Sequence, residues 1–173
     1  ELIAKDTDGN YHLTTYGKTL CLHIPSFIFM TQNKKYFKNH DFGDIPVKFI
    51  QRIGALLSGQ HVKGFVKVQE YWKDIYKNAE EYIFNILYEV SYSSDLMEPL
   101  VEKLKKNVKV NSIFSQSAII PKERKEILYK MDFKKFIEKG TLEKKMKEHV
   151  KVVVILNEKE AGIIFPTIDD EAE

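Results

Sequence analysis

The sequence predicts an α/β fold with a mixed, largely parallel sheet that is flanked by helices. From residue 61 onward, short runs rich in branched and aromatic residues alternate with segments of helical period. Repeated strand–helix–strand units of this length are typical of parallel strands joined by crossover helices. A hydrophobic content of 43% in 173 residues also provides enough apolar side chains for a packed core.

The first residues predict a β-hairpin. Residues 2–5 form a short apolar run, and residues 11–14 can return as its partner strand. Between them, Asp8 and Gly9 are typical of a tight hairpin turn, because glycine tolerates a positive φ. We therefore expect two short antiparallel strands at this end of the chain.

Two helices are expected after the hairpin. Residues 18–37 carry a helical apolar stripe, in which Pro25 should start or kink the helix. Their aromatic and aliphatic content is high for a solvated linker, so this helix should contact another surface, such as a partner chain. Residues 46–57 form the second expected helix, with Pro46 in its first turn.

The remaining elements follow the alternation of strand and helix periods. The expected strands are residues 62–68, 82–90, 108–114, 150–156 and 163–165. The expected helices are residues 71–80, 95–104, 121–129, 133–137 and 141–148. The last of these helices is strongly basic.

Three segments resemble a known family. They are YHLTTYGK (residues 11–18), NHDFGDIPVKFIQRIGAL (residues 39–56) and VVVILNEKEAGIIFP (residues 152–166). In this order and spacing they resemble archaeal winged-helix transcriptional regulators that carry a methanogenesis-regulator type of middle domain. The resemblance covers nearly the whole chain.

The resemblance implies a division of the chain into three parts. Residues 1–17 would be the wing remnant of a winged-helix DNA-binding domain, residues 18–38 a connecting helix, and residues 39–173 an effector-sensing domain. The implied partners are operator DNA, bound through the full-length winged-helix domain, and a second copy of the chain in a homodimer. Because the chain opens on Glu1, we expect it to be a fragment.

The hairpin carries the candidate DNA-binding residues Lys5, Asn10 and His12. A wing of this kind, as the resemblance implies, meets the DNA backbone or minor groove, and such phosphate contacts position a protein without reading sequence. The alternative is that these are ordinary hairpin residues.

Polar residues at two strand ends form the candidate effector site. In sheets with crossover helices, ligands bind outside the carboxyl ends of the strands. Tyr92 and Ser93 follow the strand expected at 82–90, and Ser115 and Gln116 follow the strand expected at 108–114. These groups suit a small polar or anionic metabolite, although each serine could instead cap a turn.

Two other arrangements suggest chemistry but are incomplete. The triplets His61-Val62-Lys63 and His149-Val150-Lys151 resemble those of phospholipase D type phosphodiesterases, which need an aspartate five residues after the lysine. Val68 and Leu156 occupy those positions, so we expect no enzyme.

His40, Asp41 and Asp44 could contribute to a metal site, but a turn beside a helix is the better interpretation, and we expect no metal or cofactor.

The bulk properties limit the function further. A formal net charge of +2 does not make the whole chain an overt nucleic-acid binder. A single cysteine, Cys21, fits a reducing cytoplasm, and the apolar run at residues 20–30 is too short to cross a membrane. We expect a soluble cytoplasmic protein, and a ligand-free dimerisation scaffold is a further alternative to a sensor.

Overall fold

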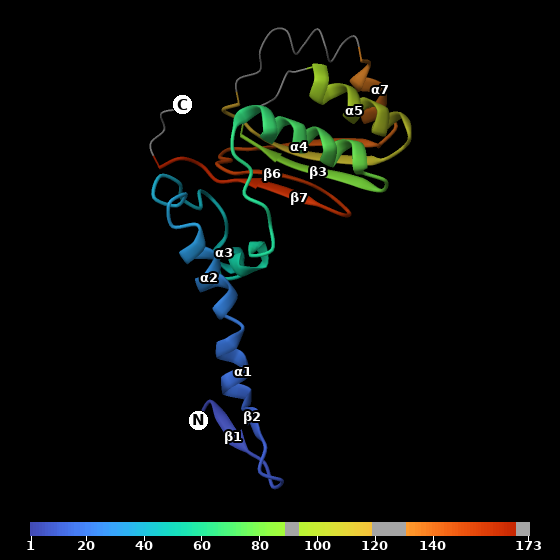
Figure 1. Cartoon of the computed structure of the whole chain (residues 1–173). Coiled ribbons are helices and arrows are strands. Elements are labelled where there is room, and N and C mark those ends of the chain that lie inside the picture. Colours follow the sequence, from blue (N-terminus) through green and yellow to red (C-terminus); the bar gives the residue numbers. More distant parts are fainter. Residues whose placement is uncertain (89–93, 119–130, 169–173) are drawn as a thin grey trace. The chain divides into compact units, whose positions relative to one another are not determined.

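A computed structural model of the chain describes residues 1–88, 94–118 and 131–168 (Figure 1). The chain divides into two compact units. Unit 1 contains residues 1–41, 45–61 and the last residues from Thr167, and unit 2 contains residues 42–44 and 62–166. The helix expected at residues 121–129 lies outside the described residues. Compactness does not assign function, so the domain boundaries after residues 17 and 38 stay predictions.

Unit 1 begins with the expected hairpin of β1 (Ile3–Lys5) and β2 (Tyr11–Leu13). The Asp6 carboxylate holds the loop, because its Oδ1 accepts the backbone N–H groups of Asp8 at 3.0 Å and Asn10 at 2.8 Å. Gly9 adopts φ +92°, which a residue with a side chain rarely adopts. The prediction of a hairpin at this end is therefore confirmed.

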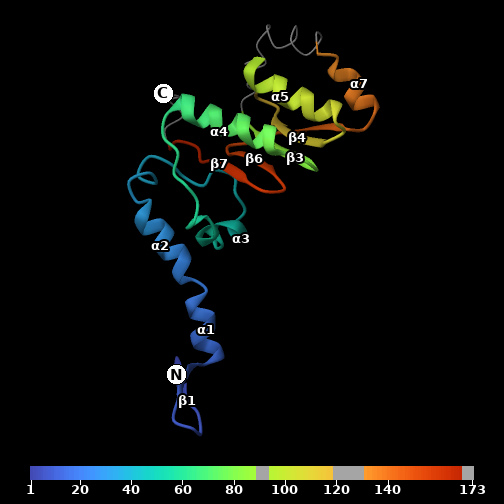
Figure 2. The ribbon, with the colours of Figure 1, turned by 45° about the vertical axis from the view of Figure 1, so that its right-hand side comes forward.

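Two helices follow the hairpin, α1 (Thr15–Cys21) and α2 (Ile24–Gln32), and Figure 2 shows them one after the other. The Thr14 hydroxyl caps α1 by accepting the Gly17 N–H at 3.0 Å. The apolar stripe expected over residues 18–37 is therefore divided into two helices, and the expectation that a helix would start at Pro25 is confirmed. Pro25 lies in the first turn of α2, where its missing N–H costs nothing, whereas inside a continuous helix it would break the ladder.

The helix expected over residues 46–57 is also divided, into α3 (Val47–Ile50) and a 3₁₀ turn, η1 (Ile53–Leu56). Within unit 1, η1 packs closely on α2. A Cβ atom on Gly54 would lie 2.5 Å from the Ser26 nitrogen, so only glycine permits this approach. The Gly54 N–H donates to Ser26 Oγ at 3.2 Å.

Unit 2 is built on a mixed sheet with strand order β5-β4-β3-β6-β7. Its strands are β3 (Tyr82–Leu87), β4 (Lys109–Ser115), β5 (Leu142–Lys147), β6 (Val153–Asn157) and β7 (Ala161–Ile164). β4 pairs in parallel with both β3 and β5, whereas β6 pairs antiparallel with both β3 and β7. The predicted α/β class with a mixed sheet is confirmed.

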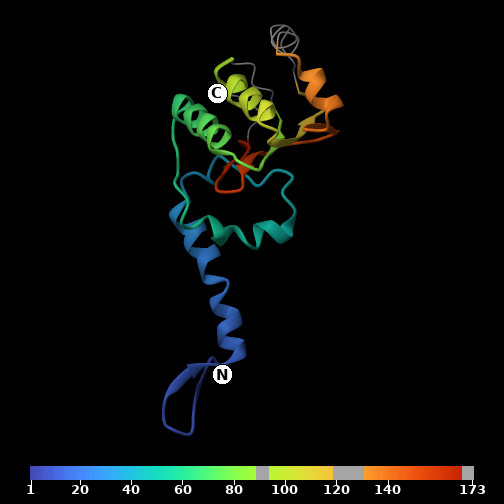
Figure 3. The same cartoon turned by 90° about the vertical axis from the view of Figure 1, so that its right-hand side faces the viewer.

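Three helices of unit 2 cover one face of this sheet: α4 (Phe65–Asn78), α5 (Ser94–Lys105) and α7 (Phe133–Glu138) (Figures 1 and 3). The core lies between these helices and the inward side chains of the strands. Its centre includes Ile83, Leu104 and Val110, none of which is measurably exposed. Alternation along β3 and β4 places Ile83 and Val110 on the helix-covered face, where α5 contributes Leu104.

Two elements of unit 2 differ from the prediction. The strand expected at residues 62–68 is wrong, because α4 begins at Phe65, directly after Gly64 with φ +94°. The helix expected at residues 141–148 is wrong as well, because Leu142–Lys147 form the edge strand β5. None of the helices in the described part of the chain is long and apolar enough to span a membrane.

Candidate functional site

A small cavity in unit 2 lies between the helices and the sheet, with a volume of about 30 Å³. A polar row crosses its floor, because Asn85 on β3 pairs with Ser112 on β4, and Ser112 pairs with Lys144 on β5. Asn85 and Ser112 are buried at inward positions, which are normally apolar, whereas Lys144 on the edge strand is exposed. The cavity is lined by Trp72, Tyr76, Asn85, Leu87, Leu96, Met97, Leu100, Ser112, Phe114, Phe133, Leu142 and Lys144.

Hydrogen bonds connect part of this row. The Tyr76 hydroxyl donates to Asn85 Oδ1 at 3.2 Å, and Asn85 Nδ2 donates to Ser112 Oγ at 3.1 Å. All three residues are buried. Trp72 Nε1 is buried too, and within the described residues it has no hydrogen-bond partner. An unpaired buried N–H is destabilising. The cavity thus has a polar floor and, within the described part of the chain, a Trp72 N–H group that lacks an acceptor.

The cavity has two interpretations. Its volume suits about one or two water molecules, which could satisfy the Trp72 N–H as part of the folded structure. Apolar walls with a few convergent polar groups are also typical of small-molecule sites. Lys144 also lines the cavity, from an exposed position on the edge strand β5.

The candidate DNA-binding residues lie on an exposed hairpin but not on one face of it. Lys5 pairs with Tyr11, so these two side chains share a face, and the Lys5 ammonium lies 5.6 Å from the centre of the Tyr11 ring. His12 pairs with Ala4 and faces the opposite side. Asn10 is in the loop, where Asp6 holds its N–H. The hairpin therefore does not bring the three residues together.

The candidate strand-end residues are only partly described. Tyr92 and Ser93 lie outside the described residues. Ser115 is 1% exposed, and its hydroxyl shares a hydrogen bond of 2.7 Å with the Ser117 hydroxyl. Gln116 is exposed, and its N–H donates to the Lys147 carbonyl at 2.9 Å. Ser115 thus stabilises a turn, and the strand-end ligand site stays a prediction.

Unit 1 exposes a large amount of apolar surface. On α2, Ile24, Phe27 and Ile28 are 48%, 71% and 40% exposed, and helical spacing puts them on one face. Tyr16 and Leu20, which share a face of α1, are also exposed. The buried face of α2 is a different one, because Phe29 is 9% exposed. Clustered exposed apolar residues usually mark an interface.

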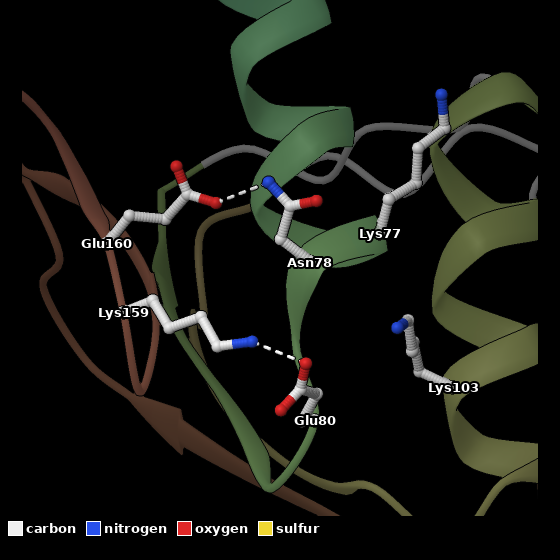
Figure 4. A pocket seen from close by; sticks show the side chains of 6 residues that line it. All are labelled: Lys77, Asn78, Glu80, Lys103, Lys159 and Glu160. Atoms are coloured by element: carbon white, nitrogen blue, oxygen red, sulfur yellow. Dashed lines mark hydrogen bonds and ion pairs between the residues drawn. The ribbon is translucent and has the colours of Figure 1, made fainter.

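A wider, open groove of about 430 Å³ in unit 2 lies at the turn between β6 and β7 (Figure 4). Within this groove Lys159 contacts Glu80 at 2.5 Å, and Lys103 donates to the Ala79 carbonyl at 2.6 Å. Figure 4 also shows Asn78 donating to Glu160. Because its lining contains both lysines and glutamates, the groove has no clear preference for a charged ligand.

The two histidine triplets of the phosphodiesterase interpretation lie in ordinary surroundings. His61 meets the Tyr36 ring edge-on, with ring centres 5.1 Å apart. His149 is exposed, and its Nε2 lies 3.8 Å from the Glu148 carboxylate. His61 belongs to unit 1 and His149 to unit 2. Neither triplet begins a strand, since α4 starts at Phe65 and β6 at Val153.

Asp44, considered above as part of a metal site, has a structural role in unit 2. It accepts hydrogen bonds from Lys147 Nζ at 2.7 Å and from the Lys151 N–H at 3.1 Å. Burial acts to raise the pKa of Asp44, but these bonds outweigh it and hold the pKa below its usual value. In the described part of the chain, no three His, Cys, Asp or Glu side chains cluster as metal ligands would.

No protein-family model and no curated protein matches this sequence. Among solved structures, the chain is similar to TrmBL2, an archaeal chromatin protein whose structure is described as showing a novel mode of DNA binding. The TM-score is 0.45 and the sequence identity 13%, and the match covers 92% of this chain and 61% of that chain. This chain therefore spans about three fifths of the TrmBL2 chain.

The cavity residues were missed by sequence reasoning, although the sequence contains a signal for them. Along β3, Asn85 stands at the inward position between Ile83 and Leu87. Ser112 interrupts the inward series of β4 in the same way. A polar residue at the inward position of two neighbouring strands would have indicated this cavity rather than the strand ends.

Proposed function

We propose that this chain is the effector-sensing and oligomerisation part of an archaeal winged-helix transcriptional regulator of the cytoplasm. The hairpin Ile3–Leu13 would be the wing, α1 and α2 would carry the dimer contact, and unit 2 would sense a small molecule. Operator DNA and a second copy of the chain would be its partners. The chain itself would have no catalytic activity.

One observation carries this proposal: the exposed apolar face of α2, formed by Ile24, Phe27 and Ile28. A solvated connector needs no such face, and its residues recur at helical spacing rather than singly. A twofold-symmetric dimer would also suit a regulator, because palindromic operators mirror protein symmetry. The polar cavity of unit 2 supports the sensing part, since it offers a place where a ligand could bind.

Sedimentation of the Phe27→Asp variant tests the dimer. Phe27 is 71% exposed in the single chain, so its burial against a second copy would contribute about 2–3 kcal/mol. We expect a dimer for the unsubstituted chain, and a dissociation constant that rises roughly a hundredfold in the variant. Gln32→Asp is the matched control, because it adds the same charge at an exposed position of the same helix. A monomer at high concentration, or equal effects of the two substitutions, would refute the proposed interface.

A further inference from the structure

We propose that β7 pairs edge to edge with β7 of a second copy of the chain, so that two unit 2 sheets join into one continuous sheet. This contact uses a different element from the α2 face and does not rest on the proposed function. Because β7 has only four residues, the pairing is short. We therefore expect it to be weaker than the α2 contact and to join chains at higher concentration.

The first reason is that β7 is an edge of the sheet with unused backbone groups (Figure 1). The Asn157 N–H donates to the Glu160 carbonyl at 3.0 Å, so the backbone groups of Glu160 face β6. By alternation along the ladder, Ala161 and Ile163 point their N–H and C=O groups away from the sheet. In the part of the chain that the structure describes, no hydrogen bond occupies these four groups.

The second reason is the difference between the two edges of the sheet. The other edge strand, β5, has the sequence LEKKMK, in which four of six residues are charged. Charged side chains on an edge strand oppose pairing with another sheet. The sequence of β7 is AGII, without any charge. An uncharged edge strand with unused backbone groups is a template for a further strand.

The third reason is that β7 is complementary to itself. A twofold axis perpendicular to the sheet keeps each face continuous, so directly opposed residues must lie on the same face. An axis through Gly162 opposes Ala161 of one copy to Ile163 of the other, and each such pair exchanges two hydrogen bonds. All four outward groups of each strand are then used. Gly162 faces its own counterpart in a non-hydrogen-bonded pair, where the Cα atoms are about 4.5 Å apart and the missing side chain leaves room.

The other symmetric register that would use these groups is blocked. An axis through Ile163 would oppose Ala161 to Phe165 of the second copy. Phe165 is only 5% exposed and packs edge-on against Phe42, with ring centres 5.8 Å apart. Its backbone is therefore not accessible to another strand, and the axis through Gly162 is the one that the structure permits.

The side chains on the face of the sheet away from the helices agree with this register. Two apolar rows cross that face and end on β7. They consist of Ile86, Val154 and Ile163, and of Phe84, Leu156 and Ala161. With the axis at Gly162, the Ile163 row of one copy continues into the Ala161 row of the other, and the large Ile163 side chain lies against the small Ala161.

A crosslinking experiment locates the axis. Cys21 is the only cysteine, so the Cys21→Ser chain with Gly162→Cys carries a single thiol. The new Cβ would lie 3.4 Å from Ile75 Cδ1, an ordinary contact. Only at the proposed axis does this thiol face its own counterpart within reach of a disulfide. Under mild oxidation we expect a covalent dimer to form rapidly, whereas Lys145→Cys on the exposed edge strand β5 should crosslink only by random collision.

Proline substitution tests the hydrogen bonds. Ile163→Pro removes an outward N–H and leaves the ladder to β6 intact, because proline is tolerated on an edge strand where its nitrogen faces solvent. We expect this change to abolish crosslinking through Gly162→Cys. Ile163→Val keeps the N–H and is the matched control, which should crosslink as before. Far-UV circular dichroism checks that both variants are folded.

Amide hydrogen exchange provides a measurement that needs no change in β7. It is followed residue by residue in the Phe27→Asp chain, so that association through α2 does not contribute. We expect exchange at Ala161 and Ile163 to slow as the protein concentration rises. The Gly162 amide, which faces β6, should be protected at every concentration.

The possible results are distinct. The edge pairing is overturned if Gly162→Cys crosslinks no faster than Lys145→Cys, if crosslinking survives Ile163→Pro, or if exchange at Ala161 and Ile163 is independent of concentration. Sedimentation of Phe27→Asp tests the α2 interface separately. Failure of one contact therefore leaves the other standing.

Discussion

At the scale of single residues, Glu158 does more to fix the fold than its place in a surface turn indicates. Its carboxylate accepts the backbone N–H groups of Glu80 at 2.9 Å and Glu81 at 3.3 Å, and lies 3.5 Å from that of Tyr82. Burial acts to raise its pKa, but the backbone bonds outweigh it and lower the pKa below its usual value. Glu158 thereby fastens the β6–β7 turn to the start of β3.

Substituting Glu158 by Gln should lower the free energy of unfolding by about 1 kcal/mol at pH 7. A folded-state pKa below the unfolded one means that the stabilisation is complete above the unfolded pKa and is lost as the pH falls through the folded pKa. The difference between the variant and the unsubstituted chain should therefore shrink at pH 3. Urea denaturation at both pH values measures it.

Glu160→Gln is the control for this substitution, because Glu160 lies in the same turn and its carboxylate accepts a hydrogen bond from the Asn78 side chain at 2.8 Å (Figure 4). Its effect should be the smaller one at pH 7. Equal effects of the two substitutions, or a Glu158 effect that is the same at pH 3, would show that the backbone bonds do not depend on the charge.

The residue scale also shows what sequence patterns could reveal. Pro25 correctly predicted an interruption near the start of a helix, because its ring removes a donor whatever the tertiary context. Ser115 looked like a ligand-facing hydroxyl, but a hydroxyl at a strand end can equally bond to the next turn, as it does with Ser117. The residue type and its sequence neighbours do not show whether such a hydroxyl faces a ligand or bonds to the next turn.

At the scale of elements, two secondary-structure predictions were wrong. In one segment a strand period and a helix period are both present, and in the other the pairing with a neighbouring strand outweighs the intrinsic helix propensity. Residues 62–68 alternate like a strand, yet Phe65 and Val68 also fit the helical spacing that continues to Trp72, and α4 begins at Phe65. Residues 142–147 consist largely of helix-forming Lys, Glu and Met. They form β5 because pairing with β4 satisfies their backbone, a contact between distant segments that no local pattern contains.

The hairpin is the element on which a DNA contact would depend. Its loop carries Asp6 and Asp8 beside Lys5, so its charge opposes phosphate binding. If the hairpin is a wing, Asp8→Asn should strengthen binding of duplex DNA, and Lys5→Ala should weaken it and reduce the salt slope by about one. Fluorescence anisotropy at several salt concentrations measures both.

Lys67→Ala provides the control for the DNA experiment, because it removes an exposed lysine from α4 in the other unit. The hairpin would be excluded as the contact if Lys5→Ala and Lys67→Ala changed the affinity equally. The same conclusion would follow if Asp8→Asn had no effect at low salt, where the electrostatic contribution is largest.

At the scale of the whole molecule, the two units differ greatly in how much apolar surface they bury. Among the described residues, Phe29 and Ile53 are the buried hydrophobic side chains of unit 1, whereas the helix–sheet core of unit 2 is extensive. Burial of apolar area is the main source of stability. A single copy of unit 1 therefore has little to stabilise it, while it exposes Phe27, Tyr16 and other large apolar residues.

This contrast predicts how the chain exchanges its amide hydrogens. The amides of β3 and β4 should exchange slowest, near the limit set by global unfolding, because they lie at the centre of the sheet. Those of α1 and α2 should exchange much faster in a dilute sample, since few buried contacts oppose their opening.

If the proposed dimer buries the exposed face of α2, the protection of the α1 and α2 amides must rise with protein concentration, while that of β3 and β4 stays constant. Phe27→Asp should remove the concentration dependence without changing exchange in the sheet. Equal protection of α2 and β3 at every concentration would show that unit 1 is stable by itself, and the apolar face would then need another explanation than a second copy of the chain.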